Sequence, residues 1–211
     1  MSLFVTFEGA EGSGKSTQVE LLARQLSDLG YDVVTTREPG GTALGEALRA
    51  IVLGSEVEVS AEAEVYLMTA ARAEHIRRVI RPALSAGAVV LCDRFVDSTL
   101  AYQGAGRGLP VDELRRVQSL AIGDVWPDLT VLLDVPPEVG LARRVSGGGT
   151  NRIDREGSAF HRRVAEWFRA EAGRDPTRWI VVDGQPPAPV VNAAVLERVM
   201  PRLCPGRAAR L

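Results

Sequence analysis

Gly9-Ala10-Glu11-Gly12-Ser13-Gly14-Lys15-Ser16 is the stretch that decides the fold of this chain. It follows an apolar run, residues 3–7, and precedes a segment with helical spacing of apolar residues, 17–29. This setting predicts a phosphate-binding loop, because the glycines let successive backbone N–H groups face one anion at the N-terminus of the next helix. Lys15 can then reach the β- and γ-phosphates of a nucleotide, and Ser16 can ligate Mg²⁺. The glycine spacing does not fit the Gly-x-Gly-x-x-Gly pattern of a dinucleotide-binding loop.

The composition of the chain favours one soluble domain. Its 211 residues can bury a sizeable core, and a formal net charge of −2 argues against a large cationic surface for nucleic acid. Only two cysteines occur, Cys92 and Cys204, so we expect a reducing cytoplasm rather than a disulfide framework. The N-terminus does not resemble a signal peptide, and no apolar run reaches membrane-spanning length. We therefore expect a cytoplasmic protein with neither a nucleic-acid nor a membrane partner.

Short β-rich apolar runs alternate along the chain with segments that can each hold a helix. This alternation predicts an α/β protein with the three-layer P-loop NTPase fold, in which helices cover both faces of a five-stranded, mostly parallel sheet. Ser60 is a plausible N-cap for one long helix, or two nearly collinear ones, over 60–84, and a last helix is expected over 190–199. We expect a single domain over 1–200 and a flexible tail over 201–211. The expected strands are residues 3–7, 32–36, 88–92, 129–135 and 178–182.

A second nucleotide-binding feature follows the third expected strand, where the chain reads Asp93-Arg94. An acid at the carboxyl edge of the sheet, beside the first strand, can bind Mg²⁺ directly or through water. Asp93 could equally cap the helix that follows the strand. The guanidinium of Arg94 would point into the same crevice, where planar bidentate contacts to phosphate favour arginine.

Three blocks of sequence, in this order, resemble the bacterial thymidylate kinases. They are Phe-Glu-Gly-x-Glu-Gly-x-Gly-Lys-Ser-Thr-Gln over 7–18, Arg-Glu-Pro-Gly-Gly-Thr over 37–42, and Asp-Arg-Phe-x-Asp-Ser-Thr-Leu-Ala-Tyr-Gln-Gly over 93–104. The resemblance covers nearly the whole chain. It implies transfer of the γ-phosphoryl group of ATP to dTMP with Mg²⁺, a step in dTTP biosynthesis, by a homodimer. The helix over 60–84 and a stripe of Leu114, Val117, Leu120 and Ala121 could supply the dimer face, although such a stripe more often packs in a core.

The resemblance also implies which residues hold the donor and the metal. Arg143 would pack on adenine, and Ser16, Asp93 and Glu38 would lie at the metal. The expected ATP-binding residues are Gly9, Ala10, Glu11, Gly12, Ser13, Gly14, Lys15, Ser16, Thr17, Arg143 and Gln185.

On the acceptor side, the resemblance implies that Tyr102 packs against the deoxyribose, although a Tyr in this position could also fill the core. Met68 stands where the family has a Phe that stacks on thymine, and core packing is equally open for it. A kinase with a shifted acceptor is therefore the nearest alternative. The expected dTMP-binding residues are Glu11, Arg37, Met68, Arg72, Arg94, Ser98, Tyr102 and Gln103.

An arginine-bearing segment over 143–156 matches the family's lid, which closes over ATP. The phosphate-binding loop holds no arginine, yet the metaphosphate-like transition state needs positive charge. A further lid arginine of some members falls on Gly147 or Gly148 here. We expect Arg152 to supply the charge, with Arg155 in reserve, so that the expected catalytic residues are Lys15, Arg94, Arg152 and Glu11.

A nucleotide-dependent switch or ATPase remains the alternative from another class. It would hydrolyse ATP without a nucleoside monophosphate, and it would have no use for the acceptor-side arginines. A GTPase is disfavoured, because the chain contains no Asn-Lys-x-Asp guanine-recognition motif.

Overall fold

The computed structural model describes residues 2–54, 58–147 and 151–203. Within these ranges five strands form one sheet in the order β2-β3-β1-β4-β5, and every neighbouring pair is parallel. The predicted α/β class and the five expected strands are confirmed, with ends that differ by at most one residue. The strands are β1 (Leu3–Glu8), β2 (Val33–Arg37), β3 (Val89–Asp93), β4 (Leu129–Asp134) and β5 (Trp179–Asp183).

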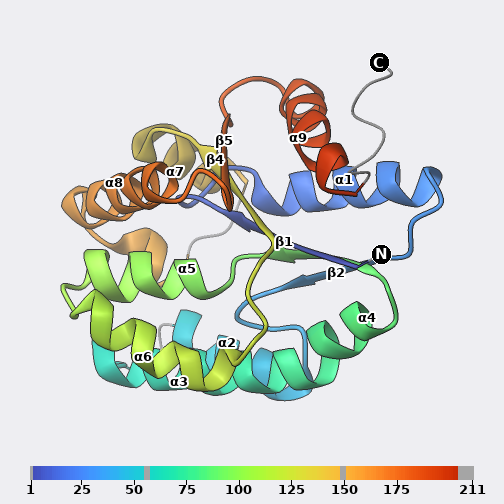
Figure 1. Cartoon of the computed structure of the whole chain (residues 1–211). Coiled ribbons are helices and arrows are strands. Elements are labelled where there is room, and N and C mark those ends of the chain that lie inside the picture. The colour runs from blue at the N-terminus through green and yellow to red at the C-terminus, as the bar shows by residue number, and fades with distance from the viewer. Residues whose placement is uncertain (1, 55–57, 148–150, 204–211) are drawn as a thin grey trace.

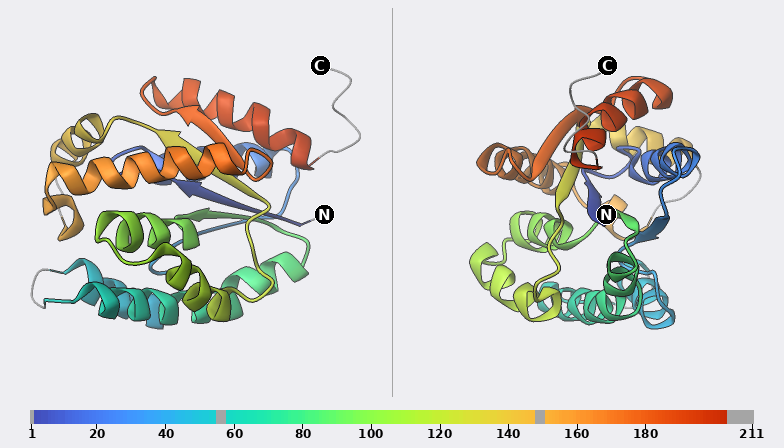
Figure 2. Two further views of the ribbon diagram at one scale, coloured as in Figure 1. Left: turned by 60° about the vertical axis from the view of Figure 1, so that its left-hand side comes forward. Right: turned by 45° about the vertical axis from the view of Figure 1, so that its right-hand side comes forward.

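Helices cover both faces of the sheet, as the continuous apolar character of β1, β3 and β4 predicts. Figure 2 shows the sheet between the layer that contains α9 and the layer that contains α3 and α6. The α-helices are α1 (Lys15–Asp28), α2 (Ala43–Leu53), α3 (Ala61–His75), α4 (Arg81–Ser85), α5 (Val96–Thr99), α6 (Val111–Ile122), α7 (Pro137–Ser146), α8 (Ser158–Arg174) and α9 (Ala188–Leu203). Two π-helical segments, Ile76–Ile80 and Leu100–Gly106, and a short 3₁₀ turn, Ile153–Arg155, complete the described helices.

The core is divided by the sheet, because successive side chains of a strand point to opposite faces. In β1, Val5 and Phe7 pack in a cluster with side chains of α1 and α9, whereas Phe4 packs with Ile76 and Ile80 on the other face. All of these side chains are almost completely buried. None of the helices in the described ranges is long and apolar enough to cross a membrane.

Two helical expectations need correction. The last helix begins earlier and ends later than expected, because apolar Leu203 packs into the same cluster as α1 and extends the buried face by a turn. Residues 201–203, expected in the tail, therefore continue α9, and the rest of that tail lies outside the described residues. On α6 the expected apolar stripe divides, since Leu114 is buried whereas Leu120 is 91% exposed.

The strand register brings the candidate site together. Because all strands are parallel, their carboxyl ends meet at one edge of the sheet. Phe7, just before the phosphate-binding loop, lies opposite Asp93, and Arg37 at the end of β2 also lies opposite Asp93. The three sequence blocks thus converge on a single edge.

Candidate active site

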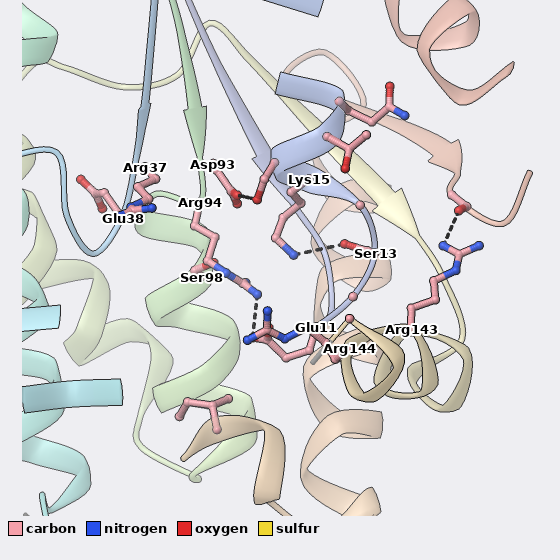
Figure 3. Close-up of a pocket in the computed structure, with 18 of the residues that line it drawn as sticks. Glu11, Ser13, Lys15, Arg37, Glu38, Asp93, Arg94, Ser98, Arg143 and Arg144 are labelled. Atoms are coloured by element: carbon pink, nitrogen blue, oxygen red, sulfur yellow. Dashed lines mark hydrogen bonds and ion pairs between the residues drawn. The ribbon is translucent and has the colours of Figure 1, made fainter. Parts of the chain in front are cut away.

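A cavity of about 800 Å³ opens at the carboxyl edge of the sheet (Figure 3). Its wall begins at the phosphate-binding loop and the ends of β2 and β3, and continues along the segment 98–103. The other side is formed by α7 and by the loop that leads into α9. A volume of this size is typical of sites for small organic ligands.

The phosphate-binding loop depends on the absence of a side chain at residue 12. Gly12 has a φ of 68°, and a Cβ built there would lie 1.9 Å from the carbonyl oxygen of Gly140 in α7. Gly140 is equally constrained, because its own Cβ would lie 2.1 Å from the Glu11 carbonyl oxygen. The two glycines therefore let α7 lie directly against the loop, which places the arginines of α7 beside the cavity.

Lys15 is held inside the loop. Its Nζ donates hydrogen bonds to the carbonyl oxygens of Gly9 and Ala10, at 3.1 and 2.9 Å, and to Ser13 Oγ at 3.1 Å. Burial, followed by the nearby charge of Arg94, lowers the pKa of Lys15 to about 8. The nearby carboxylates of Asp93 and Glu11 oppose this shift, and a bound nucleotide phosphate would add further negative charge at the amine.

Ser16 and Asp93 form an oxygen-rich pair at the start of α1. Ser16 Oγ donates a 2.5 Å hydrogen bond to Asp93 Oδ2 across the β1–β3 edge. A hydroxyl and one carboxylate fit Mg²⁺, which usually takes few protein ligands and completes its shell with water and phosphate oxygens. Across the described residues, no group of three or more His, Cys, Asp or Glu side chains could hold a metal ion.

Glu38, the third expected metal ligand, lines the cavity but has other partners. Its Oε2 accepts a hydrogen bond from Arg72 Nε at 2.7 Å, and its Oε1 lies 2.9 Å from His75 Nδ1. The side chain is only 3% exposed. Both oxygens are thus engaged away from the Ser16–Asp93 pair, and the geometry does not fit Glu38 as a direct metal ligand.

Arg94 occupies the centre of the site between the loop and the segment 98–103 (Figure 3). Its Nη2 donates to Glu11 Oε1 at 2.7 Å and its Nη1 to Ser98 Oγ at 3.1 Å. Among the described residues it is the only non-glycine with a positive φ, 71°, a strained conformation typical of functional positions. Burial acts to raise the pKa of Glu11, but the charges of Arg94 and then Lys15 outweigh it and lower that pKa.

Glu8 holds this strained turn in place and was missed at the sequence level. Its Oε1 accepts a 2.8 Å hydrogen bond from the backbone N–H of Phe95, and its Oε2 accepts one from Ser98 Oγ at 2.6 Å. The carboxyl group is completely buried, and burial together with the charge of Asp97 raises its pKa to about 8. An acid at the end of an otherwise apolar strand was the sequence feature that could have revealed it.

Most of the expected acceptor-side residues meet at the cavity. Tyr102 donates a hydrogen bond to Glu11 Oε1 at 3.1 Å, and its ring lies 4.9 Å from the Arg94 guanidinium carbon. Arg37 is 54% exposed and pairs with Glu46 at 3.0 Å. The residues from the expected dTMP set that line the wall are Glu11, Arg37, Met68, Arg94, Ser98, Tyr102 and Gln103.

Arg72 is the exception, because it lies inside the protein rather than on the cavity wall. Its side chain is 0% exposed, and its guanidinium donates to Glu38, Thr99, Gln118 and the Phe95 carbonyl oxygen. Four acceptors on four segments leave it little freedom to reach a ligand. Arg72 supports the turn that carries Arg94.

The arginines of the expected lid are arranged differently from the prediction. Arg143 lines the cavity and donates to the carbonyl oxygens of Gly184 and Gln185, both at 2.9 Å. Arg152 does not line the cavity, because its guanidinium is bonded to the Val52 carbonyl oxygen and to Glu64. The alternative, Arg155, is exposed and is not part of the wall either.

Arg144 is a second lid arginine on the cavity wall, beside Arg143, and sequence reasoning gave it no role. It lies beside Glu11 in Figure 3, and it pairs with Asp154 at 3.1 Å. The close packing of Gly12 on Gly140 sets this position, which no sequence pattern indicated. Gly147 also lines the wall, whereas Gly148 lies outside the described residues.

Comparison with known proteins agrees with this geometry. A family model described as thymidylate kinase matches residues 7–195. Thymidylate kinase of Thermomicrobium roseum is 57% identical over 208 residues, which cover 98% of this chain and 99% of that protein. The enzyme of Pseudomonas entomophila is 49% identical over 194 residues and 92% of each chain. A crystal structure of thymidylate kinase from Ehrlichia chaffeensis gives a TM-score of 0.77 at 35% identity, covering 94% of this chain and 98% of that one. The chain belongs to the thymidylate kinase family.

Proposed function

We propose that this chain transfers the γ-phosphoryl group of ATP to dTMP, giving ADP and dTDP on the route to dTTP. The observation that carries the proposal is a single cavity that joins a phosphate-binding loop to the acceptor-side residues, with Arg94 between the two halves. Phosphoryl transfer needs in-line placement of the reactants and fixed positive charge rather than covalent help from the protein. An acceptor phosphate is already ionised, so no strong general base is required.

The donor half binds ATP through the loop. The backbone N–H groups of residues 9–17 would hold the phosphates, Lys15 would reach the β- and γ-phosphates, and Arg143 and Gln185 would border the adenine. Ser16 and Asp93 would hold Mg²⁺ directly or through water. Held there, the ion would supply positive charge that offsets the charge developing on the phosphates.

The acceptor half binds dTMP against Met68 and Tyr102, with Ser98 and Gln103 nearby. Arg37 and Arg94 would contact its phosphate, and Glu11 would hold Arg94 in place through their 2.7 Å ion pair. Ring-to-guanidinium contact between Tyr102 and Arg94 links the sugar side of the pocket to the phosphate side. In this arrangement Arg72 stabilises the site from behind.

Arg144, rather than Arg152, supplies the missing positive charge at the transferring phosphate. The support for this assignment is its place on the cavity wall near Glu11 and the loop. Its partner Asp154 keeps the guanidinium oriented before ATP arrives. An arginine in such a position is worth about 10³-fold or more in rate.

The active form is a cytoplasmic homodimer. The support is the family resemblance, together with two exposed large side chains on neighbouring helices, Tyr66 of α3 at 65% and Leu120 of α6 at 91%. Light scattering at micromolar concentration should give twice the chain mass. A monomer would contradict this part of the proposal.

The activity itself is tested with ATP labelled at the γ-phosphate. We expect the label to appear in dTDP when dTMP and Mg²⁺ are present, and little inorganic phosphate to form without an acceptor. The Lys15→Met variant should form neither labelled dTDP nor labelled inorganic phosphate. Phosphate release that is independent of any nucleoside monophosphate would instead support a switch or ATPase.

A further inference from the structure

His75 lies behind the loop that follows β2 and is bonded to that loop through both of its ring nitrogens. The side chain, in the last turn of α3, is 0% exposed and is not part of the cavity wall. Its Nδ1 lies 2.9 Å from Glu38 Oε1, and its Nε2 lies 2.6 Å from Thr36 Oγ1. A carboxylate only accepts hydrogen bonds, so Nδ1 carries a hydrogen, whereas a hydroxyl can serve Nε2 as donor or acceptor. The imidazole therefore joins α3 to two points of the loop.

The two residues that the imidazole holds stand on either side of Arg37. The backbone is still paired with β3 here, because the Glu38 N–H donates to the Asp93 carbonyl oxygen at 2.9 Å. Alternate side chains of an extended strand point to opposite faces, so Thr36 and Glu38 share the face that meets the imidazole. Arg37 points the other way, where it is exposed and lines the cavity. Holding the strand on one face fixes where the guanidinium leaves it on the other.

The same ring also supports the return of the loop. Gly41 has a φ of 74°, and a Cβ built there would lie 2.6 Å from His75 Nε2 and 2.7 Å from Thr36 Oγ1. The Gly41 N–H donates to Glu46 Oε1 at 3.1 Å, and Glu46 pairs with Arg37 at 3.0 Å. The imidazole thus lies against both the strand that carries Arg37 and the turn that brings a carboxylate to its guanidinium.

We propose that His75 is a positioning residue for the acceptor phosphate, because it holds the chain on both sides of Arg37 and so places the Arg37 guanidinium where that phosphate binds. The inference rests on the proposed function, since it assumes that Arg37 contacts the acceptor phosphate. A guanidinium held in place before binding loses less conformational freedom when the ligand arrives. We therefore expect His75 to act on the binding of the phosphate group and not on the binding of the nucleoside.

The test compares the affinity of the full chain for dTMP with its affinity for thymidine, which lacks the phosphate. Calorimetric titration gives both dissociation constants, and their ratio reports the contribution of the phosphate contacts. His75→Phe keeps a buried flat ring but removes both ring nitrogens. The variant should bind dTMP about tenfold or more weakly, whereas its affinity for thymidine should change by less than about twofold.

His161→Phe is the matched control. His161 is the other histidine of the chain and is 1% exposed in α8. Its Nε2 has no hydrogen-bond partner among the described residues, and it is not part of the cavity wall. The same substitution there removes a buried imidazole that is not bonded to the loop after β2. Its preference for dTMP over thymidine should stay within about twofold of that of the unmodified protein.

A double-mutant cycle separates positioning from general damage to the fold. Arg37→Ala should weaken dTMP binding by itself, and adding His75→Phe should cost little more, because the guanidinium to be positioned is gone. Losses that multiply in the double variant would overturn the inference. A preference for dTMP that is unchanged in His75→Phe, or reduced equally in His161→Phe, would also overturn it.

A second variant covers the case in which His75→Phe does not fold. Thr36→Val removes the hydroxyl that meets Nε2 and keeps the shape of the side chain. It should also weaken dTMP binding more than thymidine binding, by a smaller factor than His75→Phe because the contact with Glu38 remains. An unchanged preference in Thr36→Val would contradict the role of His75.

The same titrations distinguish this inference from the proposed function. If the unmodified protein binds dTMP no more tightly than thymidine, the proposed acceptor site fails, and the inference fails with it. If the unmodified protein prefers dTMP and His75→Phe keeps that preference, only the role of His75 fails.

Discussion

Glu8→Gln is expected to remove a large pH dependence from the free energy of unfolding. Glu8 lies at the end of β1, fully buried beneath the turn that carries Arg94, and bonds to Phe95 N–H and Ser98 Oγ. Burial, followed by the charge of Asp97, raises its pKa from the ordinary 4.5 to about 8. The folded protein therefore keeps this carboxyl protonated at pH values where the unfolded chain has released the proton.

The sign and size of the effect follow from that difference. Between pH 4.5 and 8 the folded state binds more protons than the unfolded state, so the free energy of unfolding falls as the pH rises. The full shift corresponds to about 5 kcal/mol, most of which is lost between pH 5 and 8. In Glu8→Gln the amide that replaces the carboxyl group does not titrate in this range and keeps an acceptor for Phe95 N–H. The variant should therefore lack this loss.

Urea unfolding at pH 5, 6, 7 and 8 measures the effect for the unmodified protein and for Glu8→Gln. The difference between their unfolding free energies should change steadily by about 3–4 kcal/mol in favour of the variant as the pH rises. Glu20→Gln, which removes an exposed acid from α1, controls for the loss of one carboxylate and should show no such trend. A difference for Glu8→Gln that stays constant across the range would refute the reasoning.

Three further predictions concern the donor half. Arg144→Ala should lower kcat at saturating ATP and dTMP by about 10²- to 10³-fold, and Arg152→Ala by less; the reverse order would restore Arg152 to the catalytic role. Because the pKa of Lys15 is lowered to about 8, kcat/KM for ATP should decline by about tenfold per pH unit above that value. A profile that stays flat to about pH 9.5 would show that Lys15 keeps its charge and would contradict this prediction. Gly12→Ala should lower the free energy of unfolding by several kcal/mol, because its Cβ would lie 1.9 Å from the Gly140 carbonyl oxygen. Gly30→Ala is the control: its φ is also positive but nothing lies within 4 Å, so thermal unfolding should show a loss of about 1 kcal/mol. Equal losses for the two glycines would contradict the close approach of α7.

Much of the fold could be predicted because the relevant signals are local. The apolar runs of β1, β3 and β4 are continuous, as buried parallel strands require, and Ser60 does cap α3 by accepting a hydrogen bond from the Ala63 N–H. The end of α9 could not be predicted, since it depends on where Leu203 finds apolar partners on the face of the sheet that α1 and α9 share. Tertiary packing overrode the local pattern there.

The site was predicted best where a motif fixes the backbone. Lys15, Asp93 and Arg94 meet at one edge because parallel strands bring their carboxyl ends together. Arginine side chains outside the motifs were predicted less well, since a sequence does not show which way a guanidinium turns. Arg72 turned inward to Glu38, and Arg152 turned to Glu64, whereas Arg144 reached the cavity through a glycine contact between distant segments.

One measurement tests the central claim most directly: kcat/KM of the purified protein for dTMP, dUMP, dCMP, dGMP and dAMP, each with saturating ATP and Mg²⁺. We predict that dTMP gives the highest value, that dUMP is the nearest competitor because it shares the N3 hydrogen, and that dCMP and the purine monophosphates are poor acceptors. A panel in which dTMP is matched or exceeded by another monophosphate, or in which no monophosphate is phosphorylated, would contradict the account of this cavity as a dTMP kinase site.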